Sequence, residues 1–277
     1  MPELPEVDLV KRQLQQLLPG KRIIKAELRR EKLVPDMTAD EFAAKLESSL
    51  IKTVDRRGKH ILFELDGGKT LITHLRMSGR FMLLNADLPD PKFAHAIFYF
   101  ENDVRLVFED KRHFGLMKIV ATSELFEAKE IKKLAAEPFS DEFSIEHLYA
   151  SLKRSGKSLK EFLLDQTKVT GLGNIYAAEA MFRSGIHPEK PANLVSKKKA
   201  AELHSSIREV LSYSIELSKA VPVDPTNIGG DFYGEGASGD WSVYGREGEP
   251  CRNCERPIER IKQAGRSTYF CRKCQKR

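Results

Sequence analysis

The 277-residue sequence lacks any apolar run near the roughly 20 residues that a membrane-spanning helix requires. Its N-terminus has no basic segment followed by an apolar one, so no secretory signal is visible and we expect a cytoplasmic protein. Cysteine is scarce, at four residues. Since thiols stay reduced in the cytosol, these cysteines are poor disulfide candidates. The sequence also shows no internal repeat.

The chain carries a formal net charge of +6, and this excess lies near the C-terminus. Residues 251–277 contain nine Lys/Arg and two Glu, whereas the other 250 residues sum to −1. A basic excess gathered in one short segment is typical of a surface that binds a polyanion. The length suffices for two domains and a small appendage.

Hydrophobic periodicity divides the chain into a β-rich part and a helical part. A helix with one core-facing side is predicted before Pro19-Gly20, from apolar residues at helical spacing: Val7, Val10, Leu14 and Leu17. Seven β-branched or aromatic runs follow, typical of an antiparallel sandwich or barrel: 23–28, 59–65, 69–75, 80–84, 95–100, 105–109 and 116–121. Helices are predicted at 123–136, 145–153, 158–166, 175–184 and 196–220, and a polar, glycine-rich mobile loop at 222–241.

Cysteine spacing gives the strongest single signal. Cys251-x-x-Cys254 is followed after sixteen residues by Cys271-x-x-Cys274. Each pair can reach one metal ion from a tight turn, and the separation suits a two-stranded hairpin, so we predict one structural zinc ion. Between the pairs, residues 265–269 form a predicted β-turn that carries Arg266, where a guanidinium can bind phosphate through two hydrogen bonds.

The segment Gly171–Asn174 links two predicted helices. Glycines supply turn geometry and Asn174 can cap the second helix, but an exposed helix N-terminus beside a tight turn is also a phosphate site. The sequence does not separate the two interpretations. Lys157 and Lys160 lie just upstream and can extend a phosphate contact, although a solvated helix face is the simpler interpretation for each.

Three pieces of the β-rich part combine basic, aromatic and sulfur side chains. Arg56–His60 is basic and opens a strand, which is often only charge protection of a sheet edge. His74–Gly79 places Met77 in a loop, where a core role is an alternative. Asp110–Gly115 holds Arg112 and Phe114 two residues apart, on one face if the chain is extended. Taken singly, each piece is explained by structure alone.

The N-terminus reads Met1-Pro2-Glu3. If Met1 is removed, Pro2 becomes a secondary amine with a pKa nearer about 8 than the lysine value of about 10.4. Such an amine can attack an aldehyde-level carbon and form an iminium ion that has no N–H to lose, while Glu3 supplies acid and base steps. The alternative is that Pro2 and Pro5 only stiffen the entry to a helix.

Met1–Glu6, the Arg112/Phe114 loop, Gly171–Tyr176 and the four-cysteine module occur in this order, and together they resemble the bacterial formamidopyrimidine-DNA glycosylases over essentially the whole chain. The resemblance implies an α+β fold with an N-terminal antiparallel β-sandwich, a helix–two-turn–helix domain and a zinc finger, at residues 1–136, 137–245 and 246–277. It also implies a monomeric bacterial enzyme associated with the nucleoid. The implied substrate is double-stranded DNA containing oxidised bases or abasic sites.

The family excises oxidised purines and then nicks the DNA at the abasic site. Pro2 matches its nucleophile at the sugar C1′, Glu3 its acid/base residue and Glu6 a supporting carboxylate. Lys59 matches a lysine that assists β-elimination and holds phosphate. Arg266 matches the finger arginine linked to phosphate binding and δ-elimination. No metal or organic cofactor is implied for the chemistry itself.

Six further residues match positions that contact DNA in the family. Three match contacts with the backbone: His74, His95 and Asn174. Three match side chains that fill the hole left by the everted nucleotide: Met77, Arg112 and Phe114. There are two departures. His113 stands where the family often has a second arginine. The segment 221–241 is short and glycine-rich and lacks the usual Thr/Ser-rich motif over the lesion, which leaves the lesion preference open.

Two alternatives compete with an enzyme for oxidised purines. An endonuclease VIII-like enzyme would prefer oxidised pyrimidines, but Leu4 argues against it because that branch typically has glycine there. A non-catalytic zinc-finger protein would bind bent or damaged DNA without forming a covalent intermediate. Borohydride trapping on a duplex with an abasic site separates catalysis from binding alone.

Overall fold

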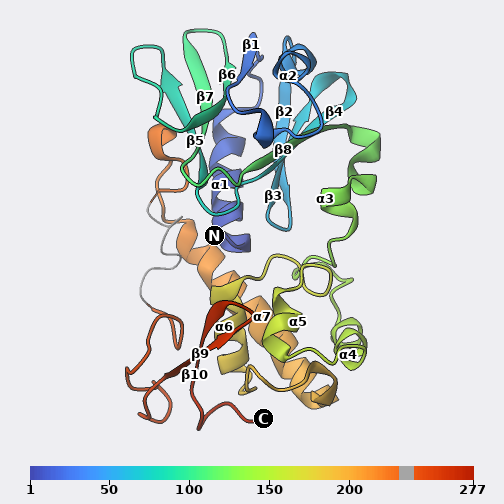
Figure 1. The fold of residues 1–277 in the computed structure, drawn as a ribbon, viewed down its shortest axis with the longest axis vertical. Coiled ribbons are helices and arrows are strands. Elements are labelled where there is room, and N and C mark those ends of the chain that lie inside the picture. The colour runs from blue at the N-terminus through green and yellow to red at the C-terminus, as the bar shows by residue number, and fades with distance from the viewer. Residues whose placement is uncertain (231–239) are drawn as a thin grey trace. The chain divides into compact units, whose positions relative to one another are not determined.

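The computed structural model describes residues 1–230 and 240–277, and the chain forms two compact units (Figure 1). Unit 1 comprises residues 1–132 and 218–236, and unit 2 comprises residues 133–217 and 237–277. Among the described residues, 218–230 cluster with the N-terminal part. The cysteine module clusters with the helices.

Unit 1 contains two four-stranded antiparallel sheets and a long N-terminal helix, α1 (Leu4–Leu17). One sheet has the order β1-β6-β7-β5, with bounds Lys25–Leu28, Ala94–Tyr99, Val104–Asp110 and Gly79–Asn85. The other has the order β2-β3-β4-β8, with bounds Ile51–Arg57, His60–Leu65, Lys69–His74 and Leu116–Ala121. The predicted α+β fold with an N-terminal sandwich is confirmed.

The core of unit 1 lies between α1 and the two sheets. Val7, Val10 and Leu14 of α1 are at most 1% exposed and belong to the same apolar cluster as the sheet residues. Phe63 of β3 and Phe81 of β5 pack edge to face across the sheets, with ring centroids 5.4 Å apart. The periodicity of α1 therefore predicts its buried face correctly, and burial of that face fixes where its N-terminus lies.

Two elements of unit 1 were missed and one prediction was wrong. Strand β2 was missed because it is an edge strand in which most residues are polar, and α2 (Ala39–Leu46) was missed because its apolar face is short. The predicted helix at 123–136 is instead a 3-10 turn, Thr122–Glu127, and a short α3, Lys129–Lys132. Ala128, between them, has the extended backbone angles φ −58° and ψ 132°, which interrupt the helical hydrogen bonds.

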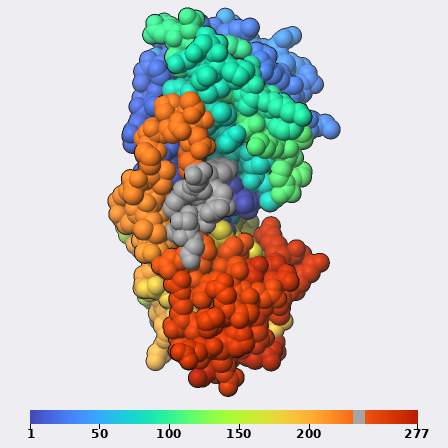
Figure 2. Space-filling model, turned by 90° about the vertical axis from the view of Figure 1, so that its left-hand side faces the viewer, coloured from blue at the N-terminus to red at the C-terminus, as the bar shows by residue number. Residues whose placement is uncertain are grey.

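Unit 2 contains four helices and the C-terminal hairpin. The helices are α4 (Ile145–Lys153), α5 (Leu159–Leu164), α6 (Asn174–Arg183) and α7 (Lys197–Ser218), close to the predicted ranges. The hairpin strands are β9 (Glu259–Gln263) and β10 (Arg266–Phe270). Figure 2 shows residues 240–277 gathered into one mass. No helix in the described part of the chain is both long enough and apolar enough to span a membrane.

The predicted loop at 222–241 is ordered over its first half. Residues Pro225–Asn227 form a 3-10 turn that packs on β5, and Ile228 is 1% exposed within the unit 1 core. The buried Gln13 of α1 holds this segment by donating to the Pro222 carbonyl and accepting from the Gly229 N–H, at 3.0 and 2.7 Å. Residues 231–239 lie outside the described residues.

Candidate active site and nucleic-acid interface

The start of α1 holds the predicted nucleophile and acid/base residue. Pro2 is buried, and Glu3 is the N-cap residue, with extended backbone angles and 2% exposure. The carboxylate of Glu6 accepts the Glu3 backbone N–H at 2.7 Å. This contact closes the first turn of the helix and satisfies a donor that the helix leaves unpaired. The predicted supporting role of Glu6 thus has a local structural basis.

Lys59 lies in the two-residue turn between β2 and β3. Gly58, with φ +58°, takes the first turn position, and the flanking Arg57 and His60 pair across the ladder. The Lys59 side chain is 5% exposed. Asp8 of α1 lies 3.6 Å from the Arg56 guanidinium, so the start of α1 and this turn lie at the same end of unit 1.

Two buried imidazoles lie beside Lys59. The rings of His60 and His74 meet edge to face with centroids 4.6 Å apart. Burial is the main cause that lowers the pKa of His60 to about 4 and that of His74 to about 2, so both are neutral near pH 7. His74 Nδ1 accepts the Arg76 backbone N–H at 2.9 Å, which leaves its Nε2 carrying the proton.

The predicted hole-filling side chains come from two loops that the sheet brings together. Gly79 and Asp110 pair where β5 begins and β7 ends, so the Met77 loop and the Arg112/Phe114 loop emerge side by side. Met77 and Phe114 are 41% and 57% exposed, which rules out the core role for Met77. The Arg112 guanidinium lies 5.5 Å from the Phe114 ring centroid. We refer to Met77, Arg112 and Phe114 as the wedge residues.

Asp110 organises both wedge loops from beneath. Burial opposes its ionisation, but hydrogen bonds from the Ser78 hydroxyl and from backbone N–H groups, including that of Gly115 at 2.6 Å, hold the pKa of Asp110 below its usual range. Ser78 Oγ also accepts the Arg112 N–H at 2.9 Å. One carboxylate therefore ties the two loops together.

Close packing on Phe108 fixes the loop bases. A Cβ at Gly79 would lie 2.6 Å from the Leu75 carbonyl oxygen and 2.6 Å from the Phe108 ring. A Cβ at Gly115 would lie 2.8 Å from the same ring. Neither position accepts a larger side chain without movement of the core.

The predicted DNA-contacting histidine His95 is buried on β6 and contacts the wedge loop. Its Nε2 lies 2.9 Å from the Asp110 carbonyl oxygen and 2.8 Å from His113 Nδ1. Burial is the main cause that lowers the pKa of His95. His113 therefore joins the loop to the sheet, a contact that the sequence did not predict.

In unit 2, the turn before α6 is built by its own side chains. Gln166 Oε1 accepts the Gly171 N–H and Gln166 Nε2 donates to the Leu172 carbonyl, both at 2.9 Å. Gly171 has φ +85°, as predicted for a glycine turn. Gly173, not Asn174, occupies the N-cap position of α6, so the predicted capping role of Asn174 is wrong.

Asn174 and Lys160 instead hold the C-terminal hairpin. Asn174 Nδ2 donates to the Ser267 carbonyl at 3.1 Å, and Lys160 Nζ donates to the same carbonyl at 2.7 Å and to Thr268 Oγ1 at 2.6 Å. Lys160 is fully buried, so its placement on a solvated face was wrong. Lys157 is exposed and pairs with Asp165 at 3.3 Å.

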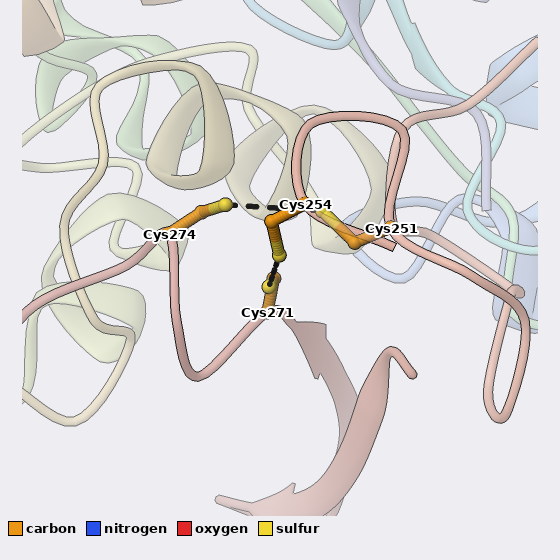
Figure 3. Close-up of side chains that lie close together, drawn as sticks. All are labelled: Cys251, Cys254, Cys271 and Cys274. Carbon is orange, nitrogen blue, oxygen red and sulfur yellow. Dashed lines mark hydrogen bonds between the residues drawn. The ribbon is translucent and has the colours of Figure 1, made fainter. Parts of the chain in front are cut away.

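The four cysteine sulfurs converge at the base of the hairpin (Figure 3). All lie within 4.8 Å of one another, with 3.5 Å between Cys254 and Cys271 and 3.9 Å between Cys251 and Cys274. Disulfide sulfurs would be about 2.05 Å apart. Tetrahedral zinc, with Zn–S bonds of about 2.3 Å, separates its ligands by about 3.8 Å, so this donor set fits one structural zinc ion.

The hairpin presents Arg266 directly after its turn. Ala264 and Gly265 are the two turn residues and both have positive φ, at +46° and +76°, as two-residue hairpin turns require. Arg266 pairs with Gln263 in the ladder and is exposed. The β-turn predicted at 265–269 is therefore misplaced, because the turn is Ala264-Gly265 and Arg266 is the first residue of β10.

Comparisons with known proteins agree with this arrangement. The family model of the formamidopyrimidine-DNA glycosylase N-terminal domain matches residues 1–117, and that of the formamidopyrimidine-DNA glycosylase H2TH domain matches residues 134–223. The model of the zinc finger found in FPG and IleRS matches residues 248–277. The chain belongs to the formamidopyrimidine-DNA glycosylase family.

Relatives match over full length. The formamidopyrimidine-DNA glycosylase of Desulforamulus reducens is 41% identical over 100% of this chain and 99% of its own, and that of Bacillus subtilis is 38% identical over 99% of each. Among solved structures, Lactococcus lactis Fpg bound to DNA containing N7-benzyl-Fapy-dG has a TM-score of 0.91 and 35% identity over both complete chains. The same L. lactis protein bound to DNA containing an oxidised pyrimidine has a TM-score of 0.89, also at 35% identity over both complete chains.

Two buried polar anchors of this formamidopyrimidine-DNA glycosylase fold were missed. Gln13 holds residues 222–229, and its spacing three residues after Val10 was an available signal because it lies on the buried face of α1. Glu179 of α6 accepts three consecutive backbone N–H groups, those of Ser242, Val243 and Tyr244, at 2.8–2.9 Å. Nothing in the sequence connects Glu179 with residues 63 to 65 positions away.

Proposed function

We propose that this chain excises oxidised purines, including formamidopyrimidines and 8-oxoguanine, from double-stranded DNA and then nicks the strand by β- and δ-elimination. As a member of its family the chain is a DNA glycosylase of base excision repair with abasic-site lyase chemistry. The observation that carries the proposed mechanism is the buried Pro2-Glu3 pair at the first turn of α1, closed by Glu6.

The first step is attack by the Pro2 nitrogen, once Met1 has been removed, on C1′ of the damaged nucleotide. The C1′–N bond to the base breaks, and the base leaves with a proton that Glu3 can supply. The proline N–H proton is then lost and the C1′–O4′ bond breaks, with a proton passing to O4′, so that the sugar ring opens to an iminium ion between C1′ and the proline nitrogen. This iminium ion has a fixed positive charge because its nitrogen carries no hydrogen, and it draws electrons from C2′. Loss of a C2′ proton then breaks the C3′–O bond, and a second elimination breaks the C5′–O bond.

Access to C1′ requires eversion of the nucleotide, at a cost of a few kcal/mol. The exposure of Met77, Arg112 and Phe114 on adjacent loops supports their role as the wedge that fills the vacated space. The buried network of Asp110 supports this role, since it holds both loops in place before DNA binds.

Backbone phosphates would be held by groups from both units. In unit 1 we assign this role to Lys59, which also assists β-elimination, and to the neutral donor His74. His95, whose Nε2 is bonded within the protein, would act on the DNA backbone through the wedge loop that it contacts. In unit 2 we assign it to Arg266, Lys157 and the turn before α6, where Asn174 retains a second amide N–H beyond the one bonded to Ser267. Lys160 acts through the hairpin that it holds.

The zinc ion would be held by Cys251, Cys254, Cys271 and Cys274. It supplies folding free energy to the hairpin and no chemistry at the sugar. The hairpin strands bury few apolar residues, and this supports a dependence of the Arg266 position on the metal.

Oxidised purines are the proposed substrate class because Leu4 and the complete wedge set favour that branch. Oxidised pyrimidines are a second candidate, favoured by the L. lactis relative, which has been crystallised with DNA containing one. Excision from a panel of duplexes that differ only in the damaged base separates the two. We place this activity in the cytoplasm at the nucleoid, where chromosomal DNA is found in bacteria.

Borohydride trapping on a duplex with one abasic site tests the mechanism. The wild-type chain should form a stable protein–DNA adduct, whereas Pro2→Gly and a form that retains Met1 should form little or none. Pro5→Ala is the matched control, because it alters the same helix entry without touching the terminal amine. DNA binding with no adduct in the wild-type chain would instead identify a non-catalytic binder.

A further inference from the structure

His113 lies between two wedge residues, Arg112 and Phe114, and has an unusual backbone conformation. Its φ is +63°, in the left-handed region, which is uncommon for residues other than glycine although asparagine, aspartate and histidine adopt it more often than the rest. Its Nδ1 lies 2.8 Å from His95 Nε2, and its ring packs edge to face against Phe93, with centroids 5.7 Å apart. Two polar links hold this conformation in place: the side-chain contact with His95 and the hydrogen bond that the His113 backbone N–H donates to the Asp110 carbonyl at 3.2 Å.

The neighbours of His95 determine which nitrogen carries the proton. His95 Nε2 faces the Asp110 carbonyl oxygen at 2.9 Å, and a carbonyl can only accept. His95 Nε2 must therefore carry a hydrogen, which it shares between Asp110 and His113 Nδ1. His113 Nδ1 must then be unprotonated and accept this hydrogen through its lone pair, and the ring proton of His113 must be on Nε2.

We infer that His113 is a positioning residue for the wedge. In its neutral Nε2–H tautomer, His113 accepts a hydrogen bond from His95 and thereby fixes the positions of Arg112 and Phe114. Protonation of His113 breaks this hydrogen bond and frees the loop from the sheet. A protonated His113 would place an N–H on Nδ1 against the N–H of His95. Two donors facing each other at 2.8 Å repel, so the link cannot survive protonation. The expected effect of His113 on DNA rests on the proposed wedge function, whereas the tautomers of His95 and His113 do not depend on it.

Several charged groups surround the histidine pair. The titratable and charged groups nearby are Asp110, Lys111 and Arg112 on the loop, Lys92 above the Phe93 ring, and Arg30 after β1. Cations outnumber the single carboxylate, and that carboxylate is already occupied by Ser78, Arg112 and Gly115.

This arrangement predicts a pH effect of a particular sign. Histidine side chains change charge between about pH 5 and 8. If His113 were a cationic phosphate contact, acidification would strengthen DNA binding and base excision. If it is a neutral link between the loop and the sheet, acidification should weaken wedge-dependent excision while nicking at a pre-formed abasic site changes less.

The tautomers can be observed directly by ¹⁵N NMR of the histidine-labelled chain without DNA. At pH 8 we expect both His95 and His113 as Nε2–H tautomers, with a hydrogen bond detected from His95 to His113. As the pH falls, His113 protonation should coincide with loss of that hydrogen bond. An Nδ1–H tautomer at His113, or a hydrogen bond that persists after protonation, would overturn the inference.

The functional test uses His113→Asn and His113→Ala. Asparagine offers an acceptor near the Nδ1 position, tolerates positive φ and does not titrate. At pH 8, His113→Ala should reduce excision of an oxidised purine about five- to tenfold, the size expected for one hydrogen bond, and His113→Asn should restore most of it. As pH falls from 8 to 5.5, the ratio of wild-type to His113→Asn excision should fall several-fold.

A constant or rising ratio would contradict the inference, as would an equal loss for Ala and Asn at pH 8. Taking the ratio cancels titrations that both proteins share, including that of the Pro2 amine. His147→Asn on α4, an exposed histidine of unit 2, is the matched control. If excision is absent in every protein while the NMR result holds, the proposed function fails and the histidine link stands.

Discussion

At the start of α1, Pro2 and Glu3 are buried and are held by the helix and its packing against the sheets. Arg266, in contrast, is exposed on a hairpin whose position depends on four sulfurs and on donors from Lys160 and Asn174. Covalent attack needs an amine at one fixed place, so burial within a large core suits it. Side chains that contact phosphate must be exposed, so they must be held in position by buried residues beneath them.

Removal of zinc should have the largest effect, and it should affect the hairpin that carries Arg266 but not the Pro2-Glu3 pair. Structural zinc contributes roughly 10–16 kcal/mol of apparent binding free energy in small zinc modules. Chelation, or Cys271→Ser, should therefore unfold the hairpin and weaken DNA binding by more than tenfold. Hydrogen exchange should show new opening in residues 248–277 and unchanged protection in the β-sandwich. Unchanged DNA affinity after complete metal removal would contradict this.

Acidification should destabilise unit 1 through its buried histidines. His60 and His74 have pKa values of about 4 and about 2 when folded, against about 6.5 when unfolded. The unfolded chain thus binds more protons below pH 6.5, and stability falls as pH decreases, until about 4 for His60 and about 2 for His74. The loss at pH 5 is up to about 2 kcal/mol from each.

Urea unfolding followed at pH 7 and at pH 5 measures this loss. His60→Leu should reduce the difference between the two pH values, because the variant has one fewer group to protonate in the unfolded state. An undiminished difference in the variant would mean that other groups cause the acid sensitivity.

Lys160→Met should cost about 1–3 kcal/mol of stability, since it leaves the Ser267 carbonyl and the Thr268 hydroxyl with fewer buried donors. We expect this change to weaken DNA binding and to raise the proportion of β-elimination product relative to δ-elimination product, because Arg266 is less well placed. Lys197→Met is the matched control: its exposed ion pair with Glu146 contributes about 0–1 kcal/mol. Equal effects of the two variants on DNA binding and on the elimination products would contradict the positioning role of Lys160.

Phe114→Ala should have the smallest effect on stability and a selective effect on activity. The ring is 57% exposed, so its loss costs the fold little. Excision from an intact duplex should fall about tenfold, the order expected for loss of base–aromatic stacking, while nicking at an abasic site should change less. Phe126→Ala, at a 68% exposed phenylalanine, controls for loss of an exposed ring. Equal loss on both substrates would argue against the wedge role.

Local patterns in the sequence predicted the features that are local in the structure. The Cys251–Cys274 spacing and the buried face of α1 each follow from residues near one another in the chain. The turn before Arg266 was also found in this segment, but it lies at Ala264-Gly265 and not at 265–269. Strand β2 was missed because five of its seven residues are polar and its two apolar residues, Ile51 and Val54, are three positions apart, so the sequence shows no alternation of period two.

Side chains whose partners are distant in sequence were not predictable. Lys160 reads as a surface lysine because its acceptors lie more than 100 residues away. Asn174 reads as a helix cap, yet Gly173 adopts the capping conformation and frees the amide for Ser267. His113 was noted only as a departure from the family pattern, because its contact with His95 arises from the pairing of β6 with β7.

The central claim is that the amine of Pro2 becomes bonded to the deoxyribose. Mass spectrometry of the borohydride-reduced protein–DNA adduct, after proteolysis, tests this most directly. The sugar remnant should be found on the N-terminal peptide that begins at Pro2, with Met1 absent. A remnant on Lys59 or on any other internal lysine, or no adduct at all, would contradict the mechanism.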